Sequence, residues 1–83
     1  MTDFLRELSD ELGVALPRTE YDVAARRIDA VFDVNTEDVT LPLLTLKLVR
    51  TLLPLFPVNL PISSIEEQRL VAALQPFVED LMV

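Results

Sequence analysis

The chain has 83 residues, with 14 acidic side chains against 7 basic ones and a net charge of −7 at neutral pH. It contains no cysteine, histidine or tryptophan, and Gly13 is its only glycine. This composition excludes disulfides, thiol nucleophiles, Cys/His metal sites, imidazole catalysis and glycine-rich phosphate loops. The length supports a single domain over residues 1–83, and 51% of the residues are hydrophobic, which is typical of a folded chain.

Two amphipathic helices are predicted in the N-terminal half, over residues 3–12 and 20–33. In the first, apolar residues recur at helical spacing, and Gly13 follows where helices commonly end. In the second, Thr19 occupies a capping position, and Asp22 and Arg26 are spaced for an i,i+4 ion pair. Each segment is therefore predicted to bury one face.

A third helix is predicted over residues 41–53, with Thr40 as its N-cap and Pro42 in its first turn. The alternation of apolar and polar residues over 44–48 also fits a β-strand. A helix is favoured because the leucine-rich stretch is about a dozen residues long and is bounded by prolines. Residues 54–61 contain three prolines and are predicted to form a loop.

The last helix is predicted over residues 64–82. Ser63 and Ser64 each precede a glutamate by three residues, which gives two overlapping capping boxes. Pro76 falls on the face opposite to the apolar residues, so we expect a kink there and not an end. The four segments together predict an all-α fold class, a compact and bundle-like four-helix domain.

No cofactor and no metal site is predicted. The pattern Asp33-x-Asn35-x-Glu37 resembles the opening of a calcium loop, but Asp38 stands where that loop needs glycine and Leu44 where it needs a bidentate glutamate. The other carboxylate pairs are sequence neighbours, which point about 100° apart on a helix and form no acid–base dyad. No catalytic residue is predicted, and the chain is not expected to be an enzyme.

The charges are unevenly distributed along the chain. Residues 1–38 carry ten acids against four arginines, and residues 66–83 carry four acids and Arg69. Residues 39–65 contain no acid and only two basic residues, Lys47 and Arg50. A nearly neutral, leucine-rich centre is therefore flanked by acidic ends.

The third predicted helix carries two apolar stripes where a surface helix needs one. The second stripe contains Leu43, Leu46 and Leu53, with Arg50 among them. Either the other helices cover this helix on most sides, or the second stripe meets another chain. In the latter case the leucines supply burial while Lys47 and Arg50 set orientation at the rim. The candidate partner-binding residues are Leu43, Leu46, Lys47, Arg50 and Leu53.

The apolar run over residues 41–62 is interrupted by Lys47, Arg50 and four prolines, so no membrane span is predicted. The N-terminus lacks a signal-peptide pattern, and we expect a cytoplasmic protein. Direct nucleic-acid binding is not expected at this net charge.

The best functional hypothesis is a small acidic regulator, inhibitor or assembly factor that acts by protein–protein contact. It would dock through the apolar segment 41–62, on a partner protein or on a second copy in a homo-oligomer. One alternative is an acidic mimic of nucleic acid that blocks a DNA-binding partner. Another is a carrier or accessory subunit of an enzyme, although no serine lies in the Gly-x-Asp-Ser-Leu context of carrier proteins.

Overall fold

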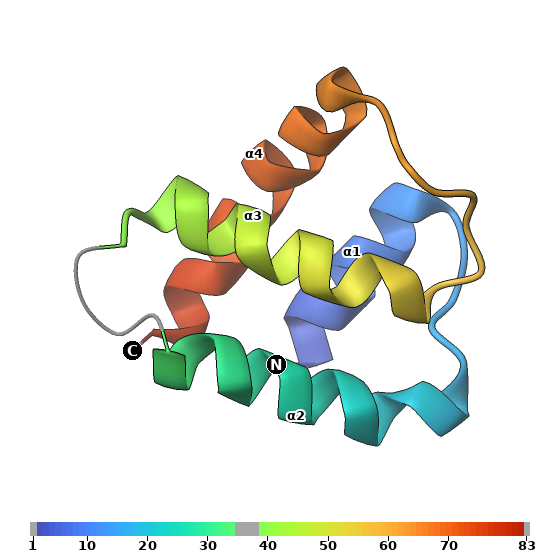
Figure 1. Cartoon of the computed structure of the whole chain (residues 1–83), viewed down its shortest axis with the longest axis horizontal. Helices are drawn as coiled ribbons and strands as arrows, with labels where there is room; N and C mark the ends of the chain where they lie inside the picture. The colour runs from blue at the N-terminus through green and yellow to red at the C-terminus, as the bar shows by residue number, and fades with distance from the viewer. Residues whose placement is uncertain (1, 35–38, 83) are drawn as a thin grey trace.

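The computed structural model describes residues 2–34 and 39–82, and helices make up most of them (Figure 1). The α-helices are α1 (Thr2–Leu12), α2 (Tyr21–Val34), α3 (Leu41–Leu52) and α4 (Ser64–Leu81). Two 3₁₀ turns, η1 (Arg18–Glu20) and η2 (Leu53–Leu55), precede α2 and follow α3. No strand occurs within the described ranges, so the predicted all-α, four-helix fold class is confirmed. Three residues of the calcium-loop-like pattern, 35, 37 and 38, fall outside these ranges.

The helix ends follow the local chemistry that the sequence indicates. Gly13 ends α1 with a positive φ of 74°, and its N–H donates to the Ser9 carbonyl at 2.9 Å. The Thr40 hydroxyl accepts from the N–H of Leu43 at 3.4 Å and caps α3. The Ser63 hydroxyl caps α4 by accepting from the N–H of Glu66 at 3.1 Å. These three predicted signals are confirmed.

Five helix boundaries differ by one residue from the predicted ones, and two of these adjoin prolines. The Pro17 carbonyl accepts from the N–H of Glu20 at 2.9 Å, so Thr19 lies inside a 3₁₀ turn and α2 begins only at Tyr21. Pro54 has no N–H to continue the α-helical pattern, and α3 ends at Leu52 before the η2 turn. The N–H of Leu53 still donates to the Val49 carbonyl, so Leu53 keeps the helical register although it lies in the η2 turn.

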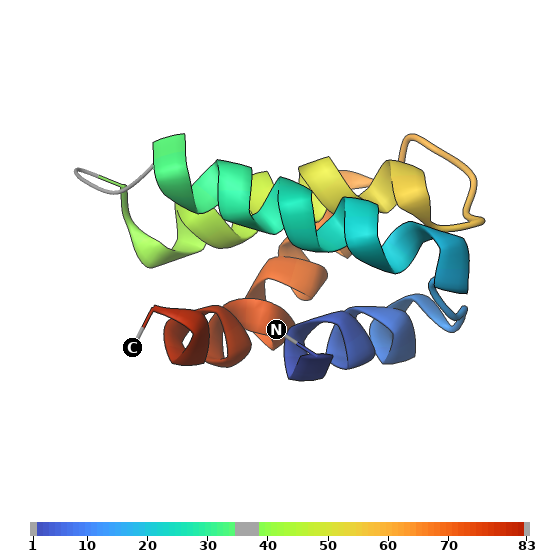
Figure 2. The same cartoon turned by 90° about the horizontal axis from the view of Figure 1, so that it is seen from below.

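The helices are arranged in two layers around one core. Figure 2 shows α2 and α3 in one layer, and α1 with the C-terminal part of α4 in the other. α3 packs against both α2 and α4, while α1 packs mainly against α4. The radius of gyration is 11.9 Å, which matches the value of about 12 Å for a folded chain of this length. The fully buried side chains include Phe4, Leu8, Leu48, Leu52, Val49, Leu70, Leu74 and Val78.

α4 passes behind α3 in the view of Figure 1 and connects the two layers. Pro76 lies inside α4 and is exposed, and the helix continues past it to Leu81. Because proline has no N–H, the Ala72 carbonyl does not receive its usual helical hydrogen bond. Within the described residues, no helix combines the length and the apolarity that a membrane crossing requires.

Candidate functional site

The predicted partner-binding residues divide among three environments. Leu43 and Leu46 line a groove between α3 and α4, whereas Lys47 and Arg50 line a groove between α2 and α3. Leu53 is only 4% exposed and belongs to the core, so it is not part of either surface. The two grooves lie on opposite flanks of α3 and differ in their chemistry.

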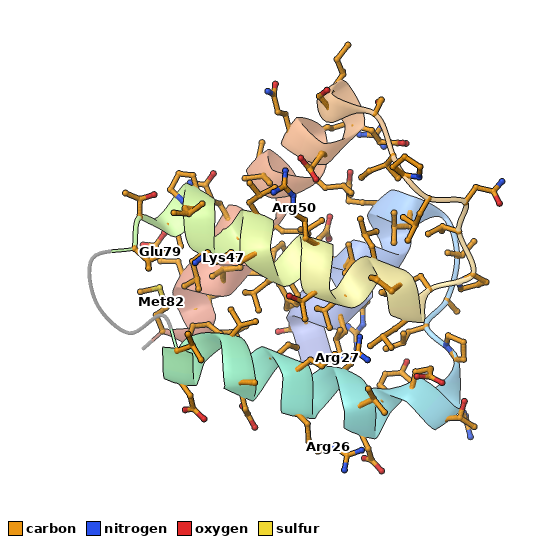
Figure 3. The ribbon with its side chains drawn as sticks, in the orientation of Figure 1. Arg26, Arg27, Lys47, Arg50, Glu79 and Met82 are labelled. Atoms are coloured by element: carbon orange, nitrogen blue, oxygen red, sulfur yellow. The ribbon has the colours of Figure 1, made fainter. Side chains whose placement is uncertain are left out.

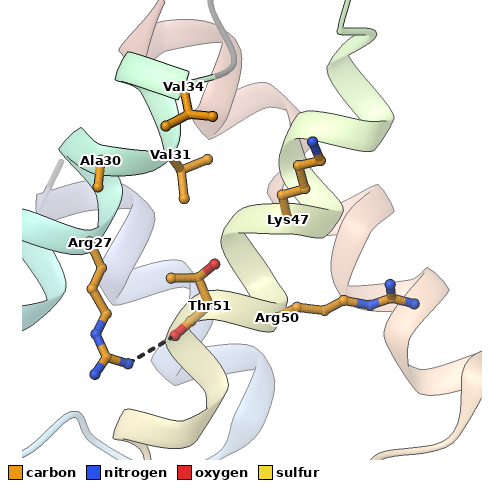
Figure 4. A pocket seen from close by; sticks show the side chains of 7 residues that line it. All are labelled: Arg27, Ala30, Val31, Val34, Lys47, Arg50 and Thr51. Atoms are coloured by element: carbon orange, nitrogen blue, oxygen red, sulfur yellow. Dashed lines mark hydrogen bonds between the residues drawn. The ribbon is translucent and has the colours of Figure 1, made fainter.

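The α2–α3 groove has a volume of about 420 Å³. Figure 4 shows it between the two helices, with Arg27, Ala30, Val31 and Val34 on the α2 side. The α3 side is formed by Lys47, Arg50 and Thr51. Val34 is 81% exposed, and Val31 is half-buried. An apolar floor is thus open to solvent.

The polar side chains around this groove are mainly cationic. The Arg27 Nη1 donates to the Thr51 carbonyl at 3.5 Å, which holds the guanidinium at one end of the groove (Figure 4). Lys47 extends from the α3 wall. None of the described residues that line the groove is acidic, although the chain as a whole has twice as many acids as bases. Arg26, the neighbour of Arg27, points away from α3 (Figure 3).

Arg50 connects α3 to α4 through a bidentate ion pair with Glu67. Its Nε and Nη2 atoms donate to the two carboxylate oxygens at 3.0 Å each. In Figure 4 the side chain of Arg50 extends away from the groove floor toward α4. This hydrogen bonding lowers the pKa of Glu67 below its usual 4.5 and raises the pKa of Arg50. The pair therefore stays charged at neutral pH.

The α3–α4 groove is similar in size, about 460 Å³, but nearly neutral. Leu43 is 43% exposed beside it, and Leu46 is half-buried. The charge of Glu67, which also lines it, is balanced by Arg50. The remaining lining residues are apolar or uncharged: Thr40, Pro42, Gln68, Val71, Ala72 and Gln75.

Other polar side chains of the described residues have structural roles or form no site. The Ser9 hydroxyl donates to the Leu5 carbonyl at 2.9 Å within α1. Partial burial, together with the like charges of Glu11 and Asp10, raises the pKa of Glu7. No three His, Cys, Asp or Glu side chains are grouped for a metal ion in residues 2–34 and 39–82.

Comparison of the chain with models of known protein families, with curated proteins and with solved structures finds no match. The candidate site therefore rests on the geometry of the two grooves. Reasoning from the sequence placed the site on residues 41–62 alone and missed the contribution of α2. The signal for it was present, since Arg27, Val31 and Val34 recur at helical spacing and share one face.

Proposed function

We propose that this protein is a binding module that holds an acidic, amphipathic segment of another protein in the α2–α3 groove. One observation carries the proposal: in a chain of net charge −7, the described lining of this groove has three basic residues, of which Arg50 is paired with Glu67, and no acidic one. The exposed apolar floor would take the apolar stripe of the segment. The carboxylates of the segment would contact Arg27 and Lys47 at the rim of the groove.

The two kinds of side chain would have different tasks. Burial of apolar side chains on Val31 and Val34 would supply most of the binding free energy, since fully desolvated contacts dominate interfaces. The cations at the rim would select an acidic partner and fix its direction in the groove. Such recognition requires no chemical step, in agreement with the expectation of a non-enzymatic regulator, inhibitor or assembly factor.

The overall negative charge is compatible with an acidic ligand because of screening. At physiological ionic strength the Debye length is about 8 Å, whereas the molecule extends 32 × 29 × 19 Å. Acids on distant faces are therefore largely screened from a ligand in the groove. The cations that line the groove act at contact distance.

The proposal is tested by selecting short random peptides from a displayed library on the purified protein. We expect the selected peptides to combine an apolar stripe with several Asp or Glu residues. Their binding, followed by fluorescence anisotropy, should weaken about tenfold or more with Arg27→Glu or Val34→Asp, because charge repulsion or a buried carboxylate opposes docking. Rising salt should weaken it further.

Arg26→Glu is the matched control, because it makes the same charge change one residue away on the opposite side of α2 (Figure 3). Binding to this variant should stay within about twofold of the wild type. Selected peptides rich in Lys or Arg, or equal losses with Arg26→Glu and Arg27→Glu, would contradict the proposal. So would the absence of any selected peptide.

A further inference from the structure

We infer that the α3–α4 groove is the contact surface between two copies of this chain, related by a twofold axis. The inference is independent of the proposed peptide groove, which lies on the other flank of α3. It follows from the charge, the apolar exposure and the hydrogen-bonding groups of this groove.

Charge limits where two such chains can meet. Each copy carries −7, so most faces repel the same face of another copy. The lining of the α3–α4 groove contains one ionised side chain, Glu67, and Arg50 of the same molecule neutralises it with two 3.0 Å hydrogen bonds. Two of these faces can therefore approach each other without bringing net charge together.

A twofold contact across the α2–α3 groove would bring like charges together. A symmetric interface places the same patch of both copies face to face. Arg27 of one copy would then lie near the same cation of its partner, and the described lining there includes no acid. The absence of charge repulsion therefore favours a second copy at the neutral groove, whereas the basic groove favours a different, acidic partner.

The neutral groove also offers apolar surface in need of burial. Leu43 is 43% exposed on α3, and half-buried Leu46 lies one turn further along. Val71 and Ala72 face them from α4. These residues would form the centre of the dimer contact. A stable contact of about 800 Å² per copy would cover about 15% of the 5309 Å² surface of the chain.

The polar groups of the groove can pair with themselves, as a twofold interface requires. The side-chain amides of Gln68 and Gln75 each carry two N–H donors and one acceptor oxygen, so either can bond to its own copy. Pro76 leaves the Ala72 carbonyl without a helical donor. A glutamine N–H of the second copy could supply one.

Light scattering coupled to size exclusion tests this surface at several protein concentrations. We expect twice the 9.4 kDa mass of one chain. Leu43→Asp should halve the measured mass without loss of helical circular dichroism, because the new carboxylate faces water in the monomer. Ala72→Arg, at an exposed position on the opposite wall, should also halve the mass without loss of helicity. This second variant keeps the test valid if Leu43→Asp fails to fold.

Ile65→Asp is the matched control, because Ile65 is 82% exposed on α4 but does not line the groove. Val34→Asp, in the other groove, should also leave the dimer mass unchanged while it weakens peptide binding. A wild-type mass of 9.4 kDa at every concentration would overturn the dimer. A dimer that survives both Leu43→Asp and Ala72→Arg, or that dissociates in the two controls, would overturn the assigned surface.

Discussion

Arg50 lines the α2–α3 groove and is paired with a residue that lines the α3–α4 groove. It forms part of the basic lining on one flank of α3, and on the other flank it neutralises Glu67. The sequence identified Arg50 as a rim residue because of its position in an acid-free segment. Its partner could not be identified in the same way, since Glu67 lies 17 residues away and the two meet only through the packing of α3 on α4.

Loss of the Glu67 charge should destabilise the protein at neutral pH but not in acid. The pKa of Glu67 is lowered in the folded state, so its contribution to stability is present above its usual value of 4.5 and is lost as pH falls through the lowered pKa. We expect Glu67→Gln to unfold at a lower temperature than the wild type at about pH 7, with the difference vanishing toward about pH 2. Thermal unfolding monitored by circular dichroism at each pH measures the difference between the two proteins.

Glu66→Gln is the appropriate comparison, because Glu66 is exposed and lies 3.6 Å from Arg69 within the same helix. Exposed pairs of this kind contribute little, so this variant should follow the wild type more closely. A Glu67→Gln difference that persists unchanged in acid would show that the ion pair is not its cause.

The helices themselves could be predicted because each begins or ends with local chemistry. Gly13, Thr40 and Ser63 act on backbone groups within four residues, and such signals can be read from the sequence alone. The burial of Leu53 was predicted wrongly, because burial depends on packing between segments and not on local chemistry. A projection at 100° per residue placed Leu53 on the second stripe, but Leu53 is only 4% exposed even though its N–H keeps the helical hydrogen bond to Val49.

Gly13→Ala should destabilise the protein by about 1 kcal/mol through the backbone alone. The φ of 74° at this position is unfavourable for alanine, and an added Cβ would meet nothing within 4 Å, so no steric clash contributes. Gly13→Asn should cost less, because asparagine tolerates the left-handed conformation better. Urea unfolding of the three proteins measures the order, and an alanine variant as stable as the wild type would contradict this account of how α1 ends.

The two grooves show why the candidate site was harder to predict than the fold. The apolar excess of residues 41–53 was visible in the sequence, but the surfaces on its flanks depend on which faces of α2 and α4 come to lie beside α3. Leu43 and Lys47 are four residues apart, yet they line different grooves. Only the tertiary arrangement separates a neutral surface from a basic one.

The absence of histidine and cysteine gives the protein as a whole a simple response to pH. No side chain with an ordinary pKa titrates between about pH 6 and 8, so the thermal midpoint should stay constant across this range. Addition of a chelator should leave it unchanged as well. A shift of several degrees in either experiment would reveal a strongly perturbed carboxylate or an oxygen-ligand metal site.

The pairing of α1 with α4 has a consequence for biosynthesis. α1 is the first of the four helices to leave the ribosome, and its main packing partner is the last. Phe4, Leu5 and Leu8, all buried in the finished core, lack their main packing partner while α2 and α3 are being translated. The main packing partner of the N-terminal apolar face is therefore missing from the nascent chain until α4 has been synthesised.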